Sequence, residues 1–427
     1  MILLMLVLML LFFALGTPIA WSMALAASIY MAFGAHVSLQ AMVQRLIGGI
    51  DTFPLLAVPF FILAGNLMNT GGITHRLVGL SRALIGHIKG GLAHVVVITN
   101  VIMAGMSGSG VADATGTGAV LIPAMKRDGY GAPFSAAIVA AAATIGPIIP
   151  PSILFVVYGS LANVSIGRLF LGGAIPGLVM GVCLIVAVYF IARIRAYPAG
   201  RRATIREFGR AVLDAALPLG MPLIILGGIV GGVTTPTEAA AAGAAYAFVL
   251  GFFVYREIKL ADLGRLIVES AVATAAIGII ISASQPFGWV LAFEQAPAAV
   301  VAFVRELHLS TWELLLALNL IMLVVGCFME GLAIMVMVTP IILPLLASAG
   351  IDPLHFGVVF TLNIMIGNIT PPVGMIMYVV CALGKITIAQ FTKEIWPFLI
   401  ALLVALGVVT FVPIVTMWLP DTVMPAR

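Results

Sequence analysis

Two short stretches combine proline and glycine inside long apolar sequence, where a helix should run without interruption. They are Ile145-Gly146-Pro147-Ile148-Ile149-Pro150-Pro151-Ser152 and Ile366-Gly367-Asn368-Ile369-Thr370-Pro371-Pro372-Val373. Because proline lacks the backbone donor and its ring clashes with the preceding turn, each stretch predicts a broken helix. A break leaves carbonyl oxygens that bind cations at the end of one half-helix, and N–H groups that attract anions at the start of the next.

Polar residues near these breaks could supply further ligands. Ser107, Ser109 and Thr115 lie in a glycine-rich segment before the first break, and their hydroxyl oxygens suit a hard cation such as sodium. For the two serines the alternative is close packing of small residues between helices, and for the breaks it is a kink that binds nothing. Asn368, helix N-termini or a basic residue in a loop could bind an anion, since no arginine or lysine falls in the apolar segments nearby.

Asp113 and Glu330 are the two carboxylates that lie deepest in the apolar segments. Either one costs about 2.5–3.5 kcal/mol at the centre of a membrane helix. That cost favours a role in coupling to an ion or proton, or in bracing the turn beside it; the alternative is a position nearer to water. Thr370 is predicted to cap the half-helix after the second break, and the paired prolines of both breaks are predicted to lie in first helical turns.

Composition and repetition indicate the elements that position these residues. The chain has 427 residues, of which 63% are hydrophobic and 8% charged, so a soluble domain is excluded and a polytopic all-α membrane protein is predicted. The breaks lie 221 residues apart, and Pro123 with Pro344 and Gly129 with Gly350 keep the same spacing. Two broken helices in corresponding positions are typical of a secondary-transporter binding site.

The histidines and cysteines form no metal or hydrolase pattern, so an enzyme is not expected.

Two inverted repeats are predicted, each with five crossings, one of them broken, plus a re-entrant hairpin. The expected boundaries are 1–192 for the first repeat (hairpin 90–125, broken helix 134–158), 193–212 for a basic cytoplasmic loop, and 213–420 for the second repeat (hairpin 314–346, broken helix 356–383). The odd number of crossings inverts the second repeat relative to the first. Of the 20 arginine and lysine residues, 16 then fall on the predicted cytoplasmic side, as the positive-inside rule requires. The four outside are Arg45, Arg168, Arg305 and Arg427.

Four motifs resemble the large membrane subunit of tripartite ATP-independent periplasmic (TRAP) transporters. They are Gly105-Met-Ser-Gly-Ser-Gly-Val-Ala-Asp113, Ile122-Pro-Ala-Met-Lys-Arg-Asp-Gly-Tyr130, Gly146-Pro-Ile-Ile-Pro-Pro-Ser152 and Gly367-Asn-Ile-Thr-Pro-Pro372. The resemblance covers essentially the whole chain.

This resemblance implies a symport that couples sodium entry to import of a small organic acid, such as a dicarboxylate, across the bacterial inner membrane. An extracytoplasmic substrate-binding protein would deliver the acid, and a small four-span membrane subunit, expected as a separate chain, would pack beside this one. The hairpins and broken helices would move as an elevator against a scaffold of the remaining helices. No cofactor besides the coupling ion Na⁺ is implied.

The same resemblance assigns ion-binding residues to both halves. They are Ser107, Ser109, Gly146, Pro147 and Pro150 in the first half and Glu330, Gly331, Gly367 and Thr370 in the second, while Asp113, Thr115 and Asn368 are candidates for substrate binding or coupling. Relatives commonly carry an aspartate where Glu330 stands, so the reach of the Glu330 side chain is longer by one methylene group.

Two other functions remain as alternatives to a tripartite importer. They are a stand-alone ion-coupled anion carrier or antiporter, and an intramembrane enzyme or assembly scaffold.

Overall fold

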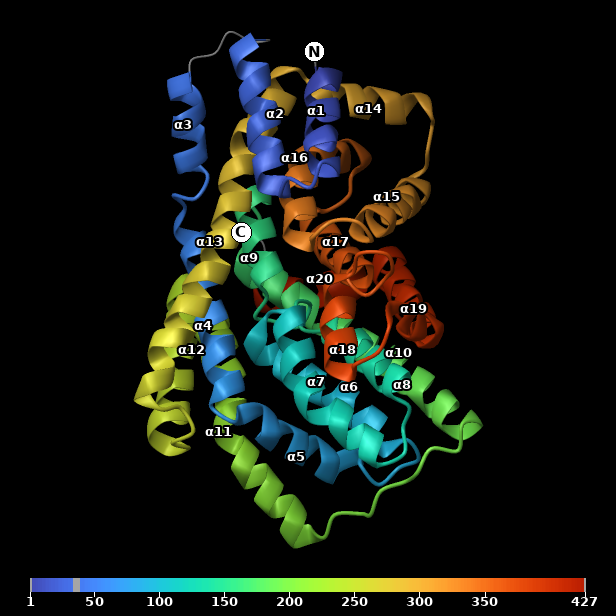
Figure 1. The fold of residues 1–427 in the computed structure, drawn as a ribbon. Helices are drawn as coiled ribbons and strands as arrows, with labels where there is room; N and C mark the ends of the chain where they lie inside the picture. Colours follow the sequence, from blue (N-terminus) through green and yellow to red (C-terminus); the bar gives the residue numbers. More distant parts are fainter. Residues whose placement is uncertain (1, 34–38, 426–427) are drawn as a thin grey trace.

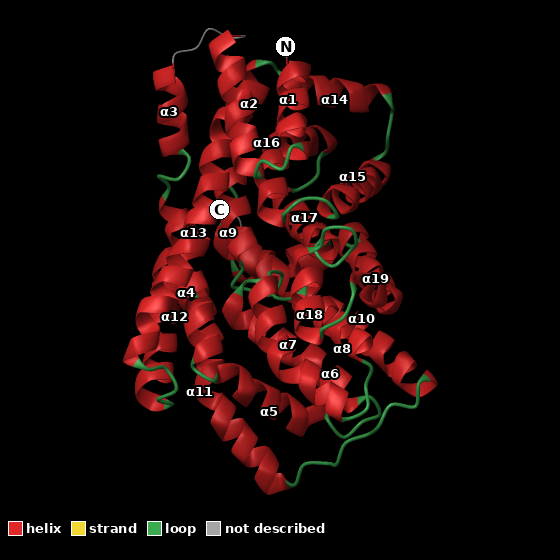
Figure 2. Cartoon of the chain, viewed as in Figure 1, coloured by secondary structure: helices red, strands yellow, loops and turns green. Residues whose placement is uncertain are grey.

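A computed structural model of the protein describes residues 2–33 and 39–425. The regular elements of these residues are helices (Figure 2), apart from one isolated β-bridge between Lys89 and Ala199. Seven helices in this described part are long and apolar enough to cross a membrane, which confirms the predicted all-α polytopic fold. Residue 1, where the predicted first repeat begins, and Arg427 lie outside the described residues.

The first half of the chain starts with short helices at one end of the molecule and continues into its centre (Figure 1). Its elements are α1 Ile2–Ala14, α2 Ile19–Phe33, α3 Leu39–Gly48, η1 Phe53–Leu56, α4 Ala57–Thr70, α5 Ile73–Ile85, α6 Gly91–Ser107, α7 Gly110–Arg127, α8 Ala132–Ala143, α9 Ile153–Ala162 and α10 Ile166–Ile194.

The second half follows with a similar order of helix pairs. Its elements are α11 Ile205–Val230, α12 Pro236–Val249, η2 Leu250–Val254, α13 Leu260–Phe293, α14 Ala296–Glu306, α15 Thr311–Gly326, α16 Gly331–Ala349, α17 Pro353–Gly367, α18 Met375–Gly384, α19 Ile388–Phe411 and α20 Ile414–Val423.

The helix interruptions fall where glycine and proline cluster in the sequence. Within the predicted hairpins, α6 and α7 are separated by residues 108–109, and α15 and α16 by residues 327–330. Within the predicted broken helices, α8 and α9 are separated by residues 144–152, and α17 and α18 by residues 368–374. In the two broken helices, proline within 144–152 and 368–374 removes donors that would continue each helix, whereas 108–109 and 327–330 contain no proline.

The basic segment predicted to be a loop is partly helical. The segment 193–212 is predicted to be a loop, but α11 begins inside it at Ile205. Thr204 starts the helix with a capping box: its hydroxyl accepts from the Glu207 amide at 3.3 Å, and the Glu207 carboxylate accepts from the Thr204 amide at 2.8 Å. A box of this kind satisfies the first free donors, so the helix extends beyond its apolar portion.

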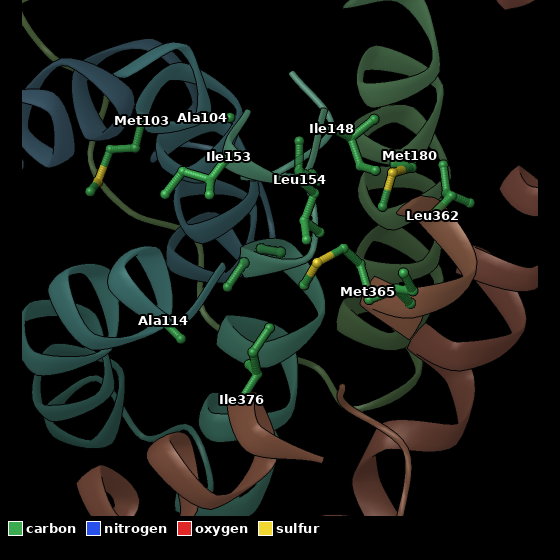
Figure 3. Packing of buried hydrophobic residues seen from close by; sticks show 14 of the residues in the cluster. Met103, Ala104, Ala114, Ile148, Ile153, Leu154, Met180, Leu362, Met365 and Ile376 are labelled. Carbon is green, nitrogen blue, oxygen red and sulfur yellow. The ribbon is translucent and has the colours of Figure 1, made fainter. Parts of the chain in front are cut away.

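Two apolar clusters hold the helices together. The larger contains residues of both broken helices and both hairpins, whereas the smaller joins α1 and α2 to the end of α13. Figure 3 shows Leu154, from just after the first break, close to Met365, from just before the second. One shared core therefore fixes the two breaks relative to each other.

A long interface separates the hairpins and broken helices from α4 and α13. Helix α4 packs on α12 and α13 on one side and meets α6 and α9 on the other, while α13 also packs against α16. Figure 1 shows α1, α2, α3 and α14 at one end of the molecule and α5 with the start of α11 at the opposite end. The interface runs between these ends, and the candidate site lies along it.

Candidate ion and substrate site

The tip of the first hairpin lies directly on the first break. The Ile153 amide donates to the Gly108 carbonyl at 3.4 Å. Gly108 has a left-handed φ of +62°, and a Cβ there would lie 2.7 Å from the Pro151 carbonyl oxygen. Because a side chain at this position meets both a strained conformation and a backbone collision, only glycine allows the tip to approach so closely.

The second half makes the same kind of contact with different residues. The Val373 amide donates to the Cys327 carbonyl at 3.1 Å. A Cβ on Gly367 would lie 2.6 Å from the backbone carbon of Gly326. Backbone therefore lies against backbone at both tips, although the two contacts share little sequence.

Ser109 and Glu330 occupy equivalent places at the two tips, 221 residues apart. The Ser109 hydroxyl caps α7 by accepting from the Ala112 amide at 3.4 Å, and the Glu330 carboxylate caps α16 by accepting from the Ala333 amide at 3.1 Å. A carboxylate at a helix N-terminus interacts favourably with the helix dipole. Both side chains are consequently held at the start of the second hairpin helix.

Asp113 lies one turn into α7 and is fully buried. Neither carboxylate oxygen has a hydrogen-bond partner among the described residues, although the Ser107 side chain is a close neighbour. One oxygen lies so close to Gly146 that any Cβ at that glycine would collide with it. A buried carboxylate without donors is costly, and its position beside the break is one that a cation could neutralise.

A cavity of about 430 Å³ lies between the hairpin tips, α4 and α13. Seven of the predicted site residues line it, namely Ser107, Ser109, Thr115, Pro147, Glu330, Gly331 and Asn368. The other five do not line it, namely Asp113, Gly146, Pro150, Gly367 and Thr370. Asp113 and Gly146 lie against each other outside the cavity lining, and both are buried.

The sequence analysis missed three polar residues of this cavity, Asn66, Asn69 and Glu269. Asn66 on α4 donates to the Ser270 hydroxyl on α13 at 2.9 Å, which joins the two helices that face the hairpins. Asn69 accepts from the Thr74 hydroxyl at 3.0 Å. For Asn66 and Asn69, the sequence signal is the presence of two amides, one turn apart, in an otherwise apolar span.

The structure corrects the predicted start of the half-helices after the breaks. Helix α9 begins after Ser152, whose hydroxyl accepts from the Phe155 amide at 3.2 Å, and α18 begins after Gly374. The paired prolines therefore precede the caps and do not lie in first turns. The Thr370 hydroxyl does not cap α18 but donates to the Ile366 carbonyl at 2.7 Å, behind it in the chain.

Of the two half-helix starts predicted to face the site, the start of α9 lines the cavity through Ile153 and Leu154, whereas the start of α18 does not. The first amides of α18, from Ile376 and Met377, donate to the Asn368 carbonyl at 3.2 and 3.4 Å. These donors are occupied and cannot receive an anion. The starts of α7 and α16, behind Ser109 and Glu330, line the cavity as well.

The residues 6–415 match the family model for the tripartite ATP-independent periplasmic transporter, DctM component. The chain belongs to this family. It is 40% identical over 406 residues to the sialic acid TRAP transporter large permease protein SiaM of Vibrio cholerae, with 95% of each chain covered. It is also 40% identical over 384 residues to the C4-dicarboxylate TRAP transporter large permease protein DctM of Pseudomonas aeruginosa, with 90% of each covered.

Among solved structures, this DctM-family chain resembles the YdaH transporter of Alcanivorax borkumensis. The TM-score is 0.66 at 16% identity, covering 89% of this chain and 90% of that one. Similarity at this level concerns the fold alone. Family membership and the seven apolar helices make the chain a multi-pass transporter subunit of the bacterial inner membrane, not an enzyme.

Proposed function

We propose that the permease imports a small organic acid by coupling its movement to sodium entry. The observation that carries this proposal is the cavity between two capped hairpin tips and two helix breaks, with the buried Asp113 carboxylate beside one break. Secondary transporters bind substrate and coupling ions at such discontinuous helices.

Sodium would bind near each tip. In the first half Asp113 supplies a charge without a partner, and Ser107 and the backbone around Gly146 supply oxygens close to it. In the second half the cavity is lined by the Glu330 carboxylate and the Asn368 amide. Hard cations prefer such oxygen ligands, and neutralising Asp113 offsets the cost of burying its charge.

The substrate would be a carboxylate held mainly by neutral donors. The two relatives are named as carriers of sialic acid and of C4-dicarboxylates, which are both carboxylic acids. Among the residues that line the cavity there is no arginine or lysine, but Asn66, Asn69 and Asn368 contribute amides. The starts of α7 and α16 add backbone donors and the positive ends of helix dipoles.

Transport would proceed by an elevator movement of the hairpins and broken helices, α6–α9 and α15–α18, along α4 and α13. Helix α18 of the second half packs against α7 and α8 of the first, and α16 packs against α9, which supports a unit that moves as one body. Two partners are proposed: an extracytoplasmic binding protein that delivers the acid, and a small four-span membrane subunit on a separate chain. Exposed apolar residues on α11, such as Leu213 and Leu223, offer one lipid- or subunit-facing surface.

The test is uptake into proteoliposomes that contain the permease and its small subunit. The binding protein is first screened against organic acids, and the acid it binds is then supplied with that protein under an inward sodium gradient. Uptake that depends on both the gradient and the binding protein is expected. Uptake of the free acid without the binding protein would favour a stand-alone carrier, and absence of gradient-driven uptake would refute a transporter of this kind.

The paired variants Ser109→Ala and Glu330→Gln test the two tips. Each removes oxygen ligands, and each is expected to weaken apparent sodium affinity by roughly tenfold, which corresponds to about 1.4 kcal/mol. Thr392→Ala, at a half-buried threonine on α19 that does not line the cavity, serves as the matched control. Sodium dependence equal to that of the control in both tip variants would remove the tips from the ion site.

A further inference from the structure

A second cavity lies along the same helices as the first. It has a volume of about 350 Å³ and is lined by residues of α3, α9, α13 and α16. On α13 the first cavity extends from Glu269 to Ile277, and the second from Ile281 to Trp289. At 1.5 Å rise per residue, the nearest edges of the two cavities are about 6 Å apart along α13 and their centres about 18 Å apart.

Arg45 on α3 lines this second cavity. Its guanidinium carbon lies 4.6 Å from the ring centroid of Trp289 on α13. In the described part of the chain no carboxylate forms an ion pair with it. Stacking on an indole ring orients a guanidinium and leaves its charge and its N–H donors free.

Neutral hydrogen-bonding groups surround the same space. The hydroxyls of Thr52 and Ser160 lie 3.4 Å apart, from opposite sides of the interface. The Gln285 side chain lies against Gly49, where any Cβ would collide with it. Together with Arg45 these residues present a charged fork, an amide and two hydroxyls, a donor set that matches a carboxylate.

We propose that the second cavity binds the carboxylate of the transported acid through Arg45 before the acid reaches the first cavity. Figure 1 shows α3 at the end of the molecule that carries α1, α2 and α14, opposite the basic segment before α11. The acid would enter from that end. The direction and the identity of the acid rest on the proposed function, whereas the presence of an anion-binding cavity does not.

The elevator movement gives this cavity its place in the cycle. Ser160 on α9 and Pro340 on α16 belong to the helices proposed to move, whereas Arg45 and Gln285 belong to those that stay. Sliding of the moving helices would carry the hairpin tips from one cavity towards the other. Arg45 then contacts the acid from the fixed side in the outer position and releases it as the tips move away.

The first test measures the charge preference of the cavity without any substrate. Ser160→Cys is introduced after replacing Cys183, Cys327 and Cys381, and its reaction rates with anionic 2-sulfonatoethyl and cationic 2-aminoethyl methanethiosulfonate are compared. The ratio of anionic to cationic rate is expected to fall about fivefold or more when Arg45→Gln is added, because a nearby cation concentrates anions. Succinate or N-acetylneuraminate at millimolar concentration should slow the anionic reagent only when Arg45 is present.

An unchanged ratio, or a Ser160→Cys variant that reacts with neither reagent, would overturn the proposal. This result is independent of transport, so it separates failure of the cavity from failure of the proposed function.

The second test uses uptake with the native cysteines in place. Arg45→Gln is expected to raise the KM for the loaded binding protein about tenfold and Arg45→Lys less, since lysine keeps the charge but loses the fork. Arg305→Gln removes another exposed arginine, on α14, and should leave uptake unchanged. If Arg45→Gln weakens binding of the binding protein itself to the membrane complex, or matches Arg305→Gln in uptake, Arg45 does not bind the acid.

Discussion

At the scale of the residue, the carboxylate of Asp113 is in an unfavourable environment. It is completely buried, it has no hydrogen-bond donor that the structure describes, and it lies against the break at Gly146. A charge in that position is destabilising unless another charge compensates it. Its burial therefore points to a bound cation or a proton, and the two can be distinguished experimentally.

Asp113→Asn is expected to weaken apparent sodium affinity roughly tenfold or more while leaving the protein folded. The amide has nearly the same shape but no charge, so a ligand is lost and the cost of burial is relieved. Initial uptake rates over a range of sodium concentrations, together with the melting temperature in detergent, measure the two effects.

Asp128→Asn is the matched control, since Asp128 is exposed at the other end of α7. Unchanged sodium affinity combined with an altered pH dependence in Asp113→Asn would indicate that the carboxylate carries a proton.

At the scale of elements, each hairpin is held to its break by glycine. Gly108 and Gly367 allow backbone to approach backbone, and Tyr158 ties the two broken helices together by donating to the Pro353 carbonyl at 2.8 Å. These contacts leave no volume for a side chain. The hairpins are therefore expected to be sensitive to the smallest possible enlargement.

Gly367→Ala is expected to lower the free energy of unfolding by about 1–3 kcal/mol, as for other over-packed sites. The added methyl group would lie 2.6 Å from the backbone of Gly326, so the second tip must move away from its break. Thermal unfolding in detergent and sodium-driven uptake should both decline.

Gly407→Ala on α19 provides the comparison, because nothing lies within 4 Å of a Cβ there. That change should be neutral or stabilising by up to about 1 kcal/mol, since alanine favours helix. Equal effects of the two substitutions would show that the tip is not tightly packed on the break.

At the scale of the whole molecule, the two cavities lie along one interface between α4 with α13 and the hairpin helices. Arginine lines the cavity nearer α3, and Glu269 lines the other. An anion would thus be attracted at one end and released near a carboxylate at the other. Which side of the membrane each end faces depends on how the two halves are oriented.

Arg127→Cys and Ser348→Cys test that orientation. Arg127 and Ser348 are exposed, lie near the ends of α7 and α16, and are 221 residues apart. In an inverted repeat, a membrane-impermeant thiol reagent should label the Arg127→Cys variant only from the cytoplasmic side and the Ser348→Cys variant only from the outside. The native cysteines are replaced beforehand. Labelling of both variants from one side would exclude inverted repeats.

Several features of this protein could be predicted from the sequence alone. Membrane character, the interruptions around Gly146 and Gly367, and the spacing of 221 residues depend on local hydropathy and on proline and glycine, whose effects on the backbone are local. The family motifs are likewise contiguous, and the family they suggested is confirmed. Seven of the proposed site residues proved to line one cavity for the same reason, since they lie at or beside interruptions.

The tertiary structure decided which residues meet. Asn66 and Glu269 enter the site from helices far apart in sequence, and Ser152, not a proline, caps the half-helix after the first break. Asp113 is distinguished from Glu330 by its burial behind the tip and not by its sequence neighbourhood. Such assignments depend on how distant helix surfaces pack and on which donors are already occupied, and neither is encoded in any single segment.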